Sequence, residues 1–209
     1  MCPAGGWRRI WRPLKNSRAE HLQNALRWNL FCSPGFNSIS KFWPVKNLPH
    51  PDDKHLEAAE GWLGLGNWKE AGEELENIAA EHRTHPFVLE LRYKIYEAAG
   101  NWEMALDVAK GLREILPDDQ WGHFYTAYAL HELKRTQESY KVLKAVVEKF
   151  PHHQFMRFNL ACYSCQLGKF EEAMQWLKKA IEIQGETDIR QLALNDRDLE
   201  SLWKEIAKI

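Results

Sequence analysis

Apolar residues between residues 51 and 185 recur at helical spacing, and the pattern itself repeats every 34 residues. Small residues share one register in successive repeats, and larger apolar residues follow them four and seven positions later. Spacing of this kind places side chains along one stripe of a helix. The small residues are Ala71, Ala105, Ser139 and Ala173. The pattern therefore predicts a series of similar helical units, each with one apolar stripe to bury.

Glycine and proline mark where the helices of each unit should end and begin. Glycines such as Gly66 stand where a helix can end in the left-handed conformation, and prolines such as Pro86 stand where the next helix can start. Stacked neighbours can bury a stripe that one helical pair cannot, so we expect an all-α solenoid of helical hairpins. The expected helices span 52–65, 68–82, 86–99, 102–115, 119–133, 136–149, 153–167 and 170–183.

The register changes after Gly185, and two further helices are expected in 186–209. Asp188 can cap a short helix through Leu194, and Asp196 can cap a last one. A solenoid needs its last apolar face covered, so this helix is predicted to cover the final helix of the array and its neighbours. Its apolar face consists of Leu199, Leu202, Trp203 and Ile206.

Residues 1–50 show no apolar period and are interrupted by prolines and glycines. The segment is basic, although the whole chain has a net charge of −1. Three interpretations stay open: a poorly ordered basic arm, an arginine-rich targeting segment, or upstream sequence translated from a mis-assigned start. For an arm that packs on nothing, deletion should lower the melting temperature by less than about 5 °C.

Composition and charge limit the classes of protein to which this chain can belong. Hydrophobic residues make up 44% and charged residues 27%, as in ordinary soluble domains. The chain contains no apolar run of transmembrane length and no signal-peptide core, so a cytoplasmic protein is expected. Basic residues do not gather in the repeats, which argues against a nucleic-acid partner. The four cysteines form no disulfide framework, which favours a reducing compartment.

The turn between the two helices of a repeat carries a glycine, then an aromatic residue, then alanine, as in Gly66-Trp68-Ala71 and Gly168-Phe170-Ala173. With the 34-residue period, this pattern resembles the tetratricopeptide-repeat family. The resemblance implies a right-handed α-solenoid of four repeats, 52–85, 86–119, 120–153 and 154–187. Residues 194–200 also look like the end motif that follows many bacterial arrays.

The third turn departs from the family pattern, because Lys134 replaces the glycine and Thr136 the aromatic residue. Tyr93 stands where a small residue is expected, which predicts that the helices 86–99 and 102–115 splay apart. The family implies a non-enzymatic scaffold that binds proteins in a groove lined by the first helix of each repeat. We find no catalytic motif and expect no cofactor.

Family groove positions map onto acidic residues in the first two repeats and aromatic residues in the last two. They predict a ligand with apolar anchors at one end and lysine or arginine at the other. The alternative is that the aromatic rings only pack between helices. The predicted groove residues are Glu60, Glu90, Lys94, Glu97, Trp121, Phe124, Tyr128, His131, Phe155 and Phe158.

Two other functions stay open. The array can be a structural or self-associating subunit of a larger assembly, or a thiol or metal protein that uses Cys162 and Cys165. His131 lies one repeat earlier on the same side, but a fourth metal ligand is not evident from the sequence. His152 and His153 follow a proline at a turn, and we expect both to be solvated.

Overall fold

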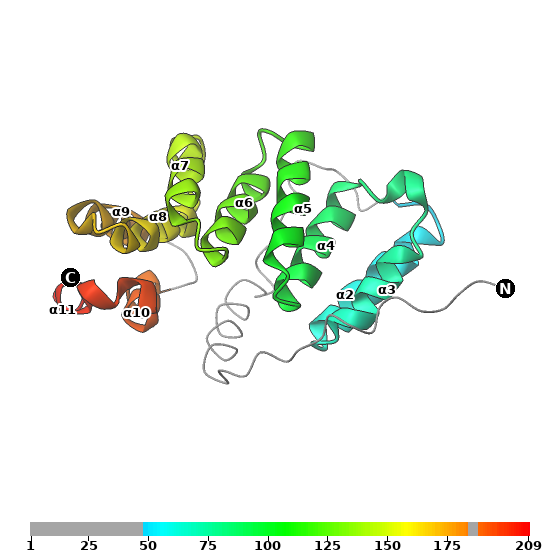
Figure 1. Cartoon of the computed structure of the whole chain (residues 1–209), viewed down its shortest axis with the longest axis horizontal. Helices are drawn as coiled ribbons and strands as arrows, with labels where there is room; N and C mark the ends of the chain where they lie inside the picture. Colours follow the sequence, from blue (N-terminus) through cyan, green and yellow to red (C-terminus); the bar gives the residue numbers. More distant parts are fainter. Residues whose placement is uncertain (1–47, 184–187) are drawn as a thin grey trace. The chain divides into compact units, whose positions relative to one another are not determined.

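The computed structural model describes residues 48–183 and 188–209, and every element in these ranges is helical (Figure 1). The predicted basic arm therefore lies almost wholly outside the described residues, all of which belong to one compact unit. Four hairpins follow one another as predicted. They consist of α2 (Asp52–Gly64) with α3 (Trp68–Glu76), α4 (Pro86–Ala98) with α5 (Trp102–Ile115), α6 (Gln120–Glu132) with α7 (Thr136–Val146), and α8 (Gln154–Gln166) with α9 (Phe170–Glu182).

The second helix of the first hairpin and that of the third hairpin are shorter than expected. Helix α3 ends at Glu76, and the chain then forms a 3₁₀ turn, η2 (Ala80–His82). The reason is the Asp52 carboxylate, which accepts a bond from the Ala79 N–H (3.2 Å) and pairs with His82 Nδ1 (2.6 Å). Ala79 therefore donates to a side chain instead of continuing the helix. Helix α7 likewise gives way to the 3₁₀ turn η3 (Val147–Lys149).

The turns inside the hairpins have the predicted left-handed geometry. Gly66, Gly100 and Gly168 have φ values of 79°, 68° and 74°. Lys134 occupies the same place in the third repeat and has a φ of 63°, although left-handed backbone is unfavourable for residues with a Cβ. The Arg135 N–H still bonds the Leu130 carbonyl at 2.9 Å, so the third turn keeps the hydrogen bond of the other three turns despite its unfavourable backbone conformation.

Small residues let the helices approach closely. Ala59, Ala71 and Ala127 are fully buried. Helices α5 and α6 approach each other closely at Gly122, where an added Cβ would lie 2.8 Å from the Arg113 backbone. The splaying predicted from Tyr93 is not seen, because α4 and α5 pack together like the other hairpin pairs. The buried Tyr93 ring lies against α6, stacked on Tyr125 with centroids 4.3 Å apart.

The C-terminal end differs from the predicted cap. Its elements are α10 (Ile189–Asn195), a 3₁₀ helix η4 (Arg197–Leu202) and one final turn, α11 (Trp203–Ile206) (Figure 1). The last helix is thus not continuous, and η4 packs mainly against α8, the neighbour of α9 in the last hairpin. Leu199, Leu202 and Ile206 are buried as expected. Trp203 is only half-buried, and its Nε1 donates to the carbonyls of Ala193 and Asp196.

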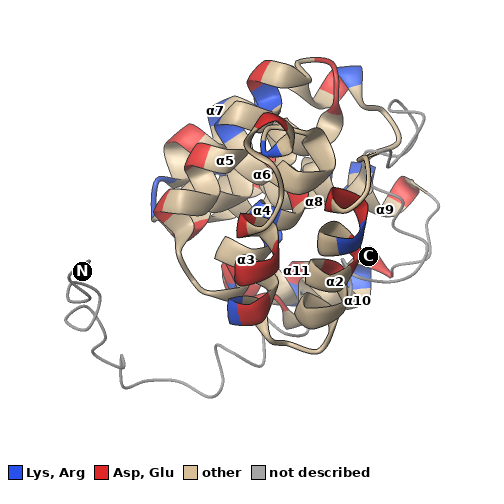
Figure 2. Cartoon of the chain, turned by 90° about the vertical axis from the view of Figure 1, so that its right-hand side faces the viewer, with Lys and Arg blue, Asp and Glu red and all other residues tan. Residues whose placement is uncertain are grey.

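Both basic and acidic residues are spread over the described helices (Figure 2). None of the described helices has the length and apolarity needed to cross a membrane.

Candidate interaction face of the A helices

The predicted groove residues all lie on the first helices of the hairpins. We call the side of α2, α4, α6 and α8 that carries them the A-helix face. Glu60 comes from α2; Glu90, Lys94 and Glu97 from α4; Trp121, Phe124, Tyr128 and His131 from α6; and Phe155 and Phe158 from α8. The face therefore draws side chains from four helices that are far apart in sequence.

The charged residues in the acidic part of the face differ in how exposed they are to solvent. Glu60 is exposed, and Lys94 and Glu97 are half-buried. Glu90 is only 3% exposed; it pairs with Lys94 Nζ at 2.8 Å and accepts a bond from the Tyr125 hydroxyl at 3.1 Å. A buried carboxylate needs such partners to offset lost hydration. Glu90 thus helps to fasten α4 to α6.

The aromatic part of the face is a packed cluster. Trp121, Phe124, Tyr128, Phe155 and Phe158 are each at most 5% exposed. The Phe124 ring contacts Trp121 edge-on at 5.9 Å and stacks on Tyr128 at 6.4 Å between centroids. Such contacts stabilise the helix packing beyond the area that they bury. These two contacts lie within α6; between repeats, the Tyr128 ring meets Trp102 of α5 edge-on at 5.7 Å between centroids.

His153 belongs to this cluster, contrary to the prediction that it is a solvated turn residue. It is 7% exposed, lies edge-on to Trp121 and stacks on Phe124, at 5.2 Å between centroids in both contacts. Its Nδ1 accepts a bond from the Met156 N–H and so caps α8. Burial, helped by the charge of Arg157, lowers the pKa of His153 to about 4. Its neighbour His152 is exposed, as predicted.

One end of the A-helix face is covered by the chain's own C-terminal segment. His131 Nε2 lies 2.9 Å from Asp198 Oδ2, and Gln166 Nε2 donates to the Asp198 carbonyl at 3.1 Å. His131 and Asp198 are 67 positions apart in the sequence. Sequence reasoning missed this contact because the apolar residues of 199–206 fit either side of the last hairpin.

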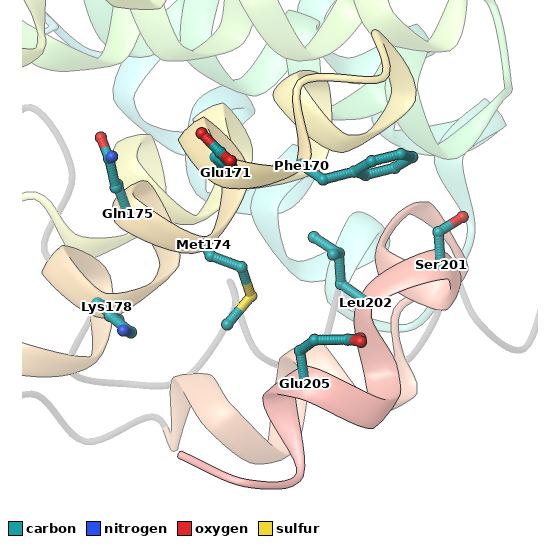
Figure 3. A pocket seen from close by; sticks show the side chains of 8 residues that line it. All are labelled: Phe170, Glu171, Met174, Gln175, Lys178, Ser201, Leu202 and Glu205. Carbon is teal, nitrogen blue, oxygen red and sulfur yellow. The ribbon is translucent and has the colours of Figure 1, made fainter.

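An open hollow lies between α9 and the C-terminal helices (Figure 3). Phe170, Met174 and Leu202 form its apolar floor, and polar side chains surround them. Phe170 is 46% exposed, so the cap leaves part of α9 uncovered. The polar residues of the rim are Glu171, Gln175, Lys178, Ser201 and Glu205.

Comparisons with known proteins agree with this architecture. A family model described as tetratricopeptide repeat matches residues 156–187, which hold the last hairpin. A solved structure of a MamA RS-1 ArsTM double mutant aligns with a TM-score of 0.61 at 16% identity, covering 78% of this chain and 93% of that chain. TTC0263, a thermophilic TPR protein of Thermus thermophilus, aligns with a TM-score of 0.58 at 18% identity, covering 76% and 100%. A structure of MamA MSR-1 aligns with a TM-score of 0.55 at 20% identity, covering 69% and 82%.

No curated protein sequence matches the chain. At identities this low, the structural likeness speaks for the fold alone. The family match to the last hairpin adds sequence evidence, and the 34-residue period extends the same signature over the three hairpins before it. The last hairpin thus matches the tetratricopeptide-repeat family in sequence, and the chain has the fold of the tetratricopeptide-repeat structures to which it is similar.

Proposed function

We propose that this protein is an interaction scaffold that binds a peptide or helix of a partner protein along the A-helix face. The observation that carries the proposal is that acidic side chains on this face lie next to its cluster of aromatic rings, which we call the ring cluster. Glu60 of α2 and Glu97 of α4 are at least partly accessible, and the ring cluster follows on α6 and α8. Acidic side chains next to aromatic rings suit a ligand that carries both basic and apolar residues.

The covered end of the face limits where such a ligand lies. Because η4 packs on α8, we place the ligand over α2, α4 and the start of α6. The accessible carboxylates of Glu60 and Glu97 would then attract lysine or arginine and orient the ligand. The apolar anchors of the ligand would contact the edge of the ring cluster, because the rings themselves are almost fully buried.

The test begins with the intact protein. Its mass in solution distinguishes a monomeric scaffold from a self-associating subunit, and a synthetic peptide array of basic–aromatic sequences then supplies ligands for titration. Glu60→Lys should weaken binding most at low salt, because it reverses an accessible charge. Glu114→Lys is the matched control, since Glu114 is exposed on α5, outside the A-helix face.

Changes in the ring cluster test the anchors. Trp121→Ala should weaken binding by about 1–3 kcal/mol, whereas Phe158→Ala, on α8 outside the proposed path of the ligand, should change binding little. Both side chains are buried, so helical content and melting temperature must be measured in parallel. Glu90→Gln is less informative, because Glu90 already bonds Lys94 and Tyr125. If Glu60→Lys and folded Trp121→Ala both bind like the parent, the partner does not use this face.

A further inference from the structure

Four side chains with metal-binding atoms meet where the C-terminal segment covers the A-helix face. Cys162 from α8 and Asp196 and Asp198 at the start of η4 form a close group, and His131 from α6 reaches this group through Asp198. The Cys162 sulfur and one carboxylate oxygen from each aspartate all lie within 4.8 Å of one another. His131 Nε2 joins them at 2.9 Å from Asp198 Oδ2.

Bonds to other groups hold both aspartates in place. Asp196 Oδ1 accepts from the Asp198 N–H at 3.0 Å, while its Oδ2 lies 3.9 Å from Cys162 Sγ. The backbone carbonyls are fixed too, since Gln166 Nε2 donates to that of Asp198 and Trp203 Nε1 to that of Asp196. The carboxylates are therefore positioned before any ligand arrives, which lowers the entropy cost of binding.

His131 is oriented in the way that metal-binding histidines usually are. Its Nδ1 lies 3.2 Å from the Thr136 hydroxyl, which can accept a bond from an N–H at that nitrogen. Without an ion, the 2.9 Å contact suits an Nε2–H that donates to Asp198 Oδ2. A bound ion would select the other tautomer, in which Nδ1–H donates to Thr136 and the Nε2 lone pair is the metal ligand. Histidine ligands commonly bond an outer group through the second ring nitrogen, which fixes the tautomer and the ring plane.

The charge of the site also suits a cation. Two carboxylates stand close to a buried thiol, and a second thiol, Cys165, follows one turn along α8. The pKa of Cys165 is raised, chiefly by burial and then by the negative charges of Asp198 and Asp196. Both carboxylates therefore act on this part of α8, where a divalent ion would offset their repulsion.

We propose that His131, Cys162, Asp196 and Asp198 bind a divalent transition-metal ion, Zn²⁺ by preference, and that the ion fastens the C-terminal segment to the A-helix face. Imidazole, thiolate and carboxylate together suit zinc, whereas Mg²⁺ and Ca²⁺ take oxygen ligands. Tetrahedral zinc places its ligand atoms about 3.3–3.8 Å apart. Cys162, Asp196 and Asp198 would need to move little to reach this spacing, whereas His131 Nε2 would have to separate from Asp198 Oδ2 to admit the ion. This set also replaces the sequence-based pairing of Cys162 with Cys165, which lacked a fourth ligand.

The test uses the full chain with Cys2 and Cys32 changed to serine, so that the thiols of α8 alone can report. After removal of bound metal with a chelator and under reducing conditions, the protein is titrated with Zn²⁺ and with Co²⁺. We expect one ion per chain and a thiolate-to-cobalt charge-transfer absorption. Free Zn²⁺ at about 100 times the dissociation constant should raise the melting temperature by about 5–10 °C.

Single substitutions identify the ligands. Cys162→Ser should abolish the charge-transfer absorption, while Cys165→Ser should keep it. Asp198→Asn should weaken Zn²⁺ binding at least tenfold, and Thr136→Val should weaken it by about 10–100-fold through the outer hydrogen bond. His123→Gln is the matched control and should bind like the parent, because His123 of α6 bonds the Pro117 carbonyl. Circular dichroism shows whether each variant keeps its helices.

Three results would overturn the proposal. The first is the absence of one-to-one Zn²⁺ binding in the folded parent. The second is a cobalt complex with no thiolate absorption. The third is unchanged metal affinity in folded Cys162→Ser and Asp198→Asn, which would leave His131 and Asp198 as an ion pair without a metal.

Discussion

Mild acid should destabilise this protein through His153. Burial lowers the pKa of this ring from 6.5 to about 4 in the folded protein. Between these values the unfolded chain binds a proton that the folded protein does not, so the free energy of unfolding falls as the pH drops from 6.5 to about 4. The difference between the two pKa values corresponds to about 3 kcal/mol. Protonation of His153 in the folded protein would place a positive charge in a buried position between Trp121 and Phe124.

Urea unfolding of the full chain at about pH 7, 5.5 and 4.5 measures this effect. His153→Asn removes the titrating ring but keeps a side chain that can cap α8, so its stability should depend much less on pH. His152→Asn is the matched control, because His152 is exposed at the neighbouring position. Some slope should remain from His85, whose pKa is also lowered, mainly by burial. If the parent and His153→Asn lose equal stability over this range, the ring is not buried in neutral form.

Three further predictions concern the backbone and the cap, and each is checked by urea and thermal unfolding. Lys134→Gly should stabilise the protein by about 1 kcal/mol, because it relieves a left-handed residue; an unchanged stability would mean that the turn is not strained. Gly122→Ala should cost about 1–3 kcal/mol by pushing α5 from α6, whereas Gly61→Ala, which has open space, should gain about 0.5–1 kcal/mol; equal effects would contradict the close approach. Trp203→Ala should cost about 2–3 kcal/mol, since Trp203 is half-buried and bonds two carbonyls; no loss would mean that the cap is not docked.

The fold could be predicted from the sequence because its determinants are local and repeated. A small residue such as Ala71 and a turn glycine such as Gly66 recur with each repeat, so each hairpin supports the interpretation of the next. Helix ends were less predictable where a distant side chain intervenes. Asp52 ends α3 early by bonding Ala79, 27 positions away, and no local pattern around Glu76 indicates this.

The sequence indicated which helices carry the A-helix face, but it did not indicate whether the side chains of this face are accessible. Position in the repeat indicates which side chains share a face, as it did for Trp121 and Phe124. Whether a ring is open to a ligand depends on what packs over it, and that is decided by contacts between repeats. His153 illustrates the limit, because a residue after a turn proline is usually exposed, yet this one closes the ring cluster.

The C-terminal segment shows why a correct apolar pattern can still leave the packing partner open. Leu199 and Ile206 are buried as their spacing predicts, and this burial alone is compatible with a cap on α9 or with a cover on α8. Polar contacts decide between the two, because Asp198 meets His131 and Gln166 only on the α8 side. Polar pairs of this kind specify one arrangement among several that bury similar apolar area. The side chains that set the position of the segment are thus the same ones that we propose as metal ligands, so a bound ion would strengthen the choice that the hydrogen bonds already make.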